Sequence, residues 1–124
     1  MVILGIESTC DETGVAVVID GHDVIFSEIA TSVALQQKFK GVVPEVAARE
    51  QVKYIIPLVE RAFLSVGKDK IDAIAVAFGP GLVGPLLVGV ETAKALAYSL
   101  DKPLIAVNHL MGHFYANWIN REVE

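Results

Sequence analysis

The sequence predicts one α/β domain built on a mixed five-stranded sheet, in the order β-β-β-α-β-α-β-α. Three apolar runs come first and are joined by connections short enough for hairpins. Later apolar runs alternate with segments in which apolar residues recur every three or four positions, as they do along one face of a helix. The first three strands can therefore pair antiparallel, whereas the later strands need helical crossovers and run parallel.

The composition is that of a compact globular chain with an acidic balance of charge. The 124 residues are 53% hydrophobic, with a mean hydropathy of +0.52, which excludes a disordered chain. Lys and Arg number 10 against 15 Asp and Glu, so the formal net charge is −5. A domain of this charge does not grip a phosphate backbone unaided, and any nucleic-acid partner is expected to bind a basic surface elsewhere.

The cysteine count and the first residues indicate a cytoplasmic location. Cys10 is the one cysteine, so no internal disulfide can form. Residues 1–5 lack the charged start and the long apolar run of a signal peptide. The uncharged run 73–90 is long enough for a membrane span, but its glycines and prolines indicate a buried strand, a glycine loop and the start of a buried helix. We therefore expect no membrane association.

The amino-terminal part is predicted to be a three-stranded meander. Residues 2–6 and 15–19 are apolar runs and are expected to be strands buried on both faces. Residues 20–23 include Gly21, which is free to take a positive φ, and they lead at hairpin distance into a third strand at 24–30. Between the first two strands, a polar connection begins at Glu7.

The remaining part is predicted to alternate helices with strands. An apolar stripe from Val52 to Val66 indicates a helix that begins near Pro44 and ends at Gly67, with Pro57 either kinking it or dividing it into two helices. The further elements are expected at 71–78 (strand), 85–100 (helix), 103–107 (strand) and 109–120 (helix).

Two histidines stand one helical turn apart, directly after a predicted strand. His109 and His113 are at positions i and i+4, so their imidazoles are expected on one helix face, close enough to share a metal ion. The spacing alone favours two surface or capping histidines, and it is the position at the edge of an α/β sheet that favours a metal. Leu110 stands where a zinc protease of the His-Glu-x-x-His type has glutamate, which disfavours peptide hydrolysis. A third ligand is expected from another segment or from outside the chain.

A glycine-rich loop links a predicted strand to a predicted helix. Gly79, Gly81 and Gly84 match Gly-x-Gly-x-x-Gly, a pattern that lets backbone N–H groups approach an anion at the positive end of a helix. A dinucleotide site is disfavoured, because the next strand ends in Asn108 instead of an acidic residue. The alternative is a turn whose glycines serve packing alone.

The polar connection at 7–14 is a third candidate segment. It places three carboxylates and three hydroxyls between two apolar strands, and Gly14 permits a close turn. Such groups can hold a hydrated cation or orient a phosphate or acyl group. The alternative is a solvated hairpin loop.

Four motifs occur in an order and at spacings that resemble one family. They are Glu7-Ser8-Thr9-Cys10-Asp11-Glu12-Thr13, Pro44-Glu45-Val46-Ala47-Ala48-Arg49, Gly79-Pro80-Gly81-Leu82-Val83-Gly84 and His109-Leu110-Met111-Gly112-His113. Together they resemble the amino-terminal half of the TsaD family, the tRNA N6-adenosine threonylcarbamoyltransferases formerly described as glycoprotease-like. The resemblance covers essentially all of the chain, with Gln51 where the family often has histidine and Pro85 where it often has serine.

This resemblance implies a fold and an activity. The fold is one lobe of the two-lobed actin, Hsp70 and sugar-kinase type, which is ribonuclease H-like. Residues 1–124 are thus expected to be a single amino-terminal lobe, with the second lobe absent. The complete enzyme is expected to move threonylcarbamoyl from threonylcarbamoyl-AMP to N6 of the tRNA adenosine adjacent to the anticodon, and the fragment alone is expected to be inactive.

The resemblance also implies site residues and partners. His109 and His113 are expected to bind one divalent metal ion, Fe²⁺ or Zn²⁺, together with an aspartate of the second lobe. The expected substrate contacts are Thr9, Glu12, Gly79 and Gly81. TsaB-like and TsaE-like proteins are the expected protein partners.

Two other functions are compatible with the sequence. A non-catalytic interaction module of the TsaB type would use the stripe 52–66 and the helix 85–100 as a helix–helix interface, through which the fragment would also self-associate. Half of a sugar or acetate kinase would hydrolyse ATP, which no residue of the chain specifically supports.

Overall fold

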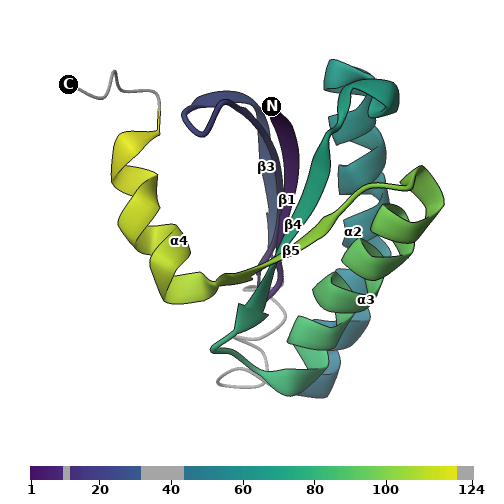
Figure 1. Ribbon diagram of the computed structural model, residues 1–124. Helices are drawn as coiled ribbons and strands as arrows, with labels where there is room; N and C mark the ends of the chain where they lie inside the picture. Colours follow the sequence, from purple (N-terminus) through teal and green to yellow (C-terminus); the bar gives the residue numbers. More distant parts are fainter. Residues whose placement is uncertain (10–11, 32–43, 120–124) are drawn as a thin grey trace.

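The computed structural model describes residues 1–9, 12–31 and 44–119. Its strands are β1 (Val2–Glu7), β2 (Glu12–Ile19), β3 (Asp23–Thr31), β4 (Ala73–Gly79) and β5 (Leu104–Asn108). Its helices are α2 (Pro44–Val66), α3 (Val83–Leu100) and α4 (His109–Tyr115), with 3-10 turns η1 (Lys68–Lys70) and η2 (Ala116–Trp118). Helices α2 and α3 cover one face of the sheet, and α4 stands on the other side (Figure 1). The predicted α/β class is confirmed.

The strands lie in the order β3-β2-β1-β4-β5. As predicted, β1, β2 and β3 form an antiparallel meander, while β4 pairs parallel with both β1 and β5. The polar connection between β1 and β2 is shorter than predicted, because Glu7 and Glu12 belong to the strands and Glu7 lies opposite Gly14. Cys10 and Asp11 lie outside the described residues.

Helix α2 continues through Pro57 as a single helix of 23 residues. The sequence left open a kink or a pair of helices at this proline, and the structure has one helix. Pro57 lies on the exposed side, whereas the adjacent Leu58 and Val59 are buried. Packing of the apolar face stabilises the helix more than local propensity does, so the proline does not end it.

Several element boundaries differ from the prediction, and three of the differences have a clear local cause. Strand β4 starts at Ala73 instead of 71, because η1 and its cap come directly before it. Helix α3 starts at Val83 instead of 85, since Leu82 is extended and caps the helix, and Pro85 still falls in the first turn. Helix α4 ends at Tyr115 and tightens into η2, as helix ends often do. The end predicted at residue 120 lies outside the described residues.

The hydrophobic core lies between the sheet and helices α2 and α3. Its largest buried apolar side chains are Leu4, Val15, Val17 and Ile74 from the sheet, Leu58 from α2, and Ile71. Complete burial of one such side chain stabilises the fold by roughly 1.5–3 kcal/mol. Helix α3 contributes the buried Ala93 and Ala97, and small side chains at these positions let it pack close to its neighbours.

The opposite face of the sheet is only partly covered, which corrects the prediction that the first two strands are buried on both faces. Buried and half-buried residues alternate along β2 and along the second half of β1. Gly5, Ala16 and Ala75 are half-buried neighbours on three adjacent strands. Among the described elements, α4 and η2 stand on this side (Figure 1). The sequences of these strands are continuous apolar runs because the second face carries small apolar residues instead of polar ones.

The uncharged run 73–90 forms β4, a loop and the first part of α3, as predicted. Four of the first five residues of β4 are buried, which explains the absence of charge there. In the three described ranges, no helix combines the length and the hydropathy that a membrane span requires.

Candidate functional site

Three parallel strands end side by side, so that their carboxyl ends form one edge of the sheet, perpendicular to the strands. Strand β1 ends at Glu7, β4 at Gly79 and β5 at Asn108, and Gly79 is paired with Asn108. This edge therefore gathers the three candidate segments of the sequence, namely the polar connection, the glycine loop and the start of α4. Ligands of open α/β sheets characteristically bind at such an edge.

The two histidines of α4 face each other at this edge. Helix α4 begins at His109 because the Asn108 side chain caps it, accepting a hydrogen bond from the backbone N–H of Leu110 at 2.9 Å. The Nε2 atoms of His109 and His113 are 2.9 Å apart, and their ring centroids are 4.4 Å apart. The structure thus brings together the two imidazoles that the spacing predicts, and metal binding by them stays a prediction.

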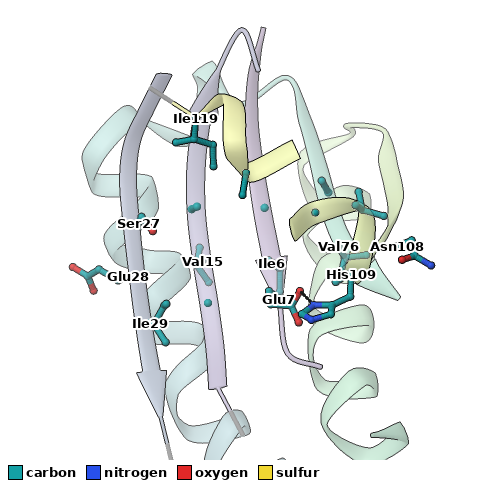
Figure 2. Close-up of a pocket in the computed structure, with 18 residues that line it drawn as sticks. Ile6, Glu7, Val15, Ser27, Glu28, Ile29, Val76, Asn108, His109 and Ile119 are labelled. Carbon is teal, nitrogen blue, oxygen red and sulfur yellow. Dashed lines mark hydrogen bonds and ion pairs between the residues drawn. The ribbon is translucent and has the colours of Figure 1, made fainter. Parts of the chain in front are cut away.

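Glu7 contacts the other nitrogen of the His109 ring. Its Oε2 lies 2.9 Å from His109 Nδ1 (Figure 2). Its Oε1 accepts a hydrogen bond from the backbone N–H of Thr9 at 2.9 Å. The Thr9 hydroxyl lies 3.4 Å from the same Nδ1. A carboxylate only accepts hydrogen bonds, so we assign the ring proton of His109 to Nδ1. His109 Nε2 then carries the lone pair, on the side of His113.

The donor set fits two ligands of a divalent metal ion. Metal–nitrogen bonds of about 2.1 Å place neighbouring ligand atoms about 3.0 Å apart at a right angle and about 3.4 Å apart in a tetrahedron. The separation of 2.9 Å between the two Nε2 atoms is close to the first of these values. Within residues 1–9, 12–31 and 44–119, no group of three or more His, Cys, Asp or Glu side chains could hold a metal. The described part of the chain therefore offers these two imidazoles and no third side chain of these types placed to share a metal ion with them.

The glycine loop packs directly on the connection that follows β1. The backbone N–H of Leu82 donates to the carbonyl oxygen of Thr9 at 2.9 Å. A Cβ atom on Gly81 would lie 2.5 Å from that oxygen and 2.8 Å from Thr9 Cβ. Packing therefore requires glycine at position 81. Substrate contacts by Thr9, Gly79 and Gly81 stay a prediction.

Ser8 joins the same connection to helix α3. It is fully buried, and its Oγ donates to the carbonyl oxygen of Pro85 at 2.8 Å and accepts from the backbone N–H of Gly89 at 3.1 Å. A Cβ atom on Gly89 would lie 2.3 Å from that Oγ. Sequence reasoning missed this contact, although a lone glycine inside a predicted helix is a signal of close packing.

Glu12 lies at the far end of the polar connection, where its exposed side chain begins β2. Its backbone oxygen accepts a hydrogen bond from Gln51 Nε2 at 3.2 Å. Gln51 is only 2% exposed on helix α2. Gln51, one of the two positions at which the chain departs from the family pattern, thus contacts the connection from inside the protein. A contact between Glu12 and substrate stays a prediction.

An apolar groove of about 490 Å³ has Glu7 and His109 in its lining. It lies between the partly covered face of the sheet and the elements α4 and η2. Figure 2 shows Glu7 and His109 side by side in its wall and Ile119 well apart from them. Gly5, Ala16 and other small residues form much of its lining. The polar residues at the carboxyl ends of the strands therefore lie next to the apolar lining of this groove.

Solved structures of two kinds share this fold. YeaZ from Pseudomonas aeruginosa matches with a TM-score of 0.64 and 21% identity, over 87% of this chain and 45% of that chain. RuvC from Thermus thermophilus, in complex with a Holliday junction substrate, matches with a TM-score of 0.56 and 11% identity, over 99% and 81% of the two chains. The fold is accordingly a ribonuclease H-like and actin-like α/β fold.

Comparison of the sequence identifies the family. Residues 23–124 match the sequence model of TsaD, described as tRNA N6-adenosine threonylcarbamoyltransferase. Proteins of that name from Symbiobacterium thermophilum and Clostridium perfringens SM101 are 55% and 54% identical over 119 and 123 residues. The chain belongs to the TsaD family. The matches cover 94% and 98% of this chain but 35% and 36% of those relatives, so the chain spans about a third of their length.

Proposed function

We propose that this chain is the metal-binding amino-terminal lobe of a tRNA threonylcarbamoyltransferase. The observation that carries the proposal is the 2.9 Å separation of the Nε2 atoms of His109 and His113, at the sheet edge of a TsaD-family chain. We assign the missing ligand and most substrate contacts to a second lobe, because the chain spans 35% of the length of the Symbiobacterium relative. The lobe by itself is then inactive.

The proposed reaction is transfer of an acyl group between two substrates. The N6 amine of the adenosine beside the anticodon attacks the carbonyl carbon of threonylcarbamoyl-AMP. A C–N bond forms, the C–O bond to the phosphate breaks, the electron pair leaves with AMP, and the amine loses a proton to solvent. A bound Fe²⁺ or Zn²⁺ would polarise the threonylcarbamoyl carbonyl and stabilise the charge that develops on its oxygen.

In that reaction, the residues of this chain bind the metal ion and orient the substrates. The Nε2 atoms of His109 and His113, 2.9 Å apart, would hold the metal ion, while the Thr9 and Gly81 segments, joined by the hydrogen bond from Leu82 N–H to Thr9 O, would help to place the acyl phosphate. Glu12 is exposed at the end of the same connection, where a substrate can reach it. Because the chain has a net charge of −5, the tRNA phosphates bind mainly to another part of the complete protein. The complete protein acts in the cytoplasm.

Metal content and acyl transfer test the proposal together. The chain would be loaded with Zn²⁺, or with Fe²⁺ under anaerobic conditions, and assayed with threonylcarbamoyl-AMP and tRNA, alone and with the remaining part of a relative supplied as a second polypeptide. We expect one metal ion per chain and transfer only when the second polypeptide is present. Full transfer by the chain alone would contradict its role as an incomplete lobe, and absence of metal in both states would contradict the metal site.

A second candidate function is an interaction module of the TsaB type, and exposed apolar side chains on two helices favour it. Val52, Ile56 and Leu64 of α2 are 60%, 49% and 86% exposed. Only part of the predicted stripe 52–66 is available, however, since Ile55 and Val59 are buried in the core. An interface on this side would therefore use the outer face of α2 together with α3.

This interface would pair the lobe with a TsaB-like partner of similar fold, which a TsaE-like protein would then join. The same surface would let the isolated chain self-associate. Sedimentation equilibrium over a range of concentrations measures this, and we expect a concentration-dependent dimer. A monomer at the highest concentration would exclude self-association and leave pairing with a different partner as the remaining form of this function.

A further inference from the structure

We propose that Glu7 is a positioning residue that fixes the His109 ring in the tautomer able to bind a divalent cation. The inference rests on the proposed function, in which His109 is a metal ligand, and it adds a residue that has no role in that proposal. Glu7 itself stays off the metal, because its carboxylate faces Nδ1 of His109 instead of Nε2. It acts through the ring.

The carboxylate of Glu7 is held at both of its oxygens. Oε1 accepts from the backbone N–H of Thr9 and Oε2 contacts His109 Nδ1, each at 2.9 Å. The backbone of Glu7 is fixed as well, because it ends β1 opposite Gly14 in the antiparallel ladder. The side chains of Glu7 and His109 are 39% and 25% exposed, so the contact is partly shielded from water. This arrangement defines one orientation for the imidazole.

The chemistry of imidazole gives this contact a consequence at the opposite nitrogen. A neutral ring has one N–H donor and one lone pair, and the carboxylate accepts only, so the donor is Nδ1 and the lone pair is on Nε2. Nε2 is the atom that faces His113 Nε2 at 2.9 Å. Carboxylates in this outer position set the tautomer and the ring orientation of metal-binding histidines, and their loss typically weakens metal binding 10- to 100-fold.

His113 depends less on the surrounding protein. Its side chain is exposed on α4, whereas His109 sits at the start of the helix, next to both Glu7 and Thr9. The ring that the fold orients is therefore His109, and the exposed ring of His113 can adjust to it. A substitution of Glu7 should consequently change the orientation and tautomer of His109 while leaving both histidines in place.

Glu7→Gln tests the inference because the amide is isosteric but has one acceptor atom in place of two. Thr9 N–H and His109 Nδ1–H face different oxygens of Glu7, so the single oxygen of the amide can take the place of only one of them. An amide N–H directed at Nδ1 favours the tautomer with the proton on Nε2. Glu91→Gln is the matched control, since it makes the same charge change at an exposed position of α3 that pairs with Lys94. Urea unfolding of both variants checks that the fold is retained.

Two measurements decide the outcome. Nitrogen-15 NMR of the neutral imidazole rings in the metal-free chain should show His109 protonated at Nδ1 in the unaltered chain and in Glu91→Gln, and at Nε2 in Glu7→Gln. Calorimetric titration with Zn²⁺ should show an affinity lowered roughly 10- to 100-fold in Glu7→Gln alone.

An Nε2-protonated His109 in the unaltered chain, or unchanged tautomer and affinity in Glu7→Gln, would overturn the inference. Equal weakening by Glu91→Gln would also overturn it, because net charge would then account for the effect. Failure of the unaltered chain to bind Zn²⁺ would instead contradict the proposed function, and the NMR comparison would still decide whether Glu7 orients the ring.

Discussion

Gly89→Ala is expected to lower the free energy of unfolding by about 2–4 kcal/mol, a large share of the roughly 5–15 kcal/mol typical of a domain. The new methyl group would lie 2.3 Å from Ser8 Oγ and 3.2 Å from Ser8 Cβ, so the helix or the serine must move. Movement of Ser8 breaks its hydrogen bonds to Pro85 O and Gly89 N in a fully buried position. Urea unfolding followed by circular dichroism measures the loss.

A double-mutant cycle with Ser8→Ala assigns this loss to the clash. Removing Oγ takes away the nearest atom to the new methyl group, and the next contacts lie at 3.2 and 3.4 Å, which small shifts relieve. The double variant is therefore expected to be more stable than the sum of the two single effects by more than about 1 kcal/mol. Additive effects would show that Ser8 and Gly89 act independently and would contradict the interpretation.

Gly112→Ala is the matched control for Gly89→Ala. Gly112 also lies inside a helix, but a Cβ atom there would meet no atom within 4 Å. The change should therefore leave stability unchanged or raise it by up to about 1 kcal/mol, because alanine favours helix more than glycine does. A loss comparable with that of Gly89→Ala would mean that packing against Ser8 is not the cause.

The sheet and its order could be predicted because their signals are local in the sequence. Apolar runs, the hairpin turn at Gly21 and the helical stripe of α2 each depend on neighbouring residues. The start of α3 could not be predicted in the same way, because the N–H of its cap, Leu82, donates to the carbonyl oxygen of Thr9 on a distant segment. The prediction that both faces of the first strands are buried was wrong for the second face. Glycine and alanine are typical of buried strands, and the sequence does not show whether a helix covers them.

Only part of the candidate site could be predicted from the sequence. The approach of His109 and His113 follows from their positions on one helix and needs no tertiary information. The contact of Glu7 with His109 joins residues 102 positions apart, and a glutamate in a polar run has many solvated alternatives. Its position at the carboxyl end of a strand parallel to the one that ends at Asn108 is the signal that would have indicated it.

His113→Ala and His109→Ala are each expected to weaken Zn²⁺ binding by more than the roughly 10- to 100-fold effect of losing an outer-sphere partner. Each change removes one of two nitrogens that approach to 2.9 Å, and a single surface imidazole cannot chelate. The double variant should lose little beyond either single one, because either change already destroys the chelate. Calorimetric titration with Zn²⁺ measures all three variants.

His22→Ala is the matched control, since His22 is a histidine of the hairpin turn that contacts Asp23 and lies on a different part of the chain. Its removal should leave the Zn²⁺ affinity unchanged. Equal weakening by all three single changes would indicate unspecific binding to exposed imidazoles, and unchanged affinity in His109→Ala and His113→Ala would place the metal elsewhere. Because His113 is exposed, its replacement should change the unfolding free energy by less than about 0.5 kcal/mol, so a loss of binding cannot be attributed to unfolding.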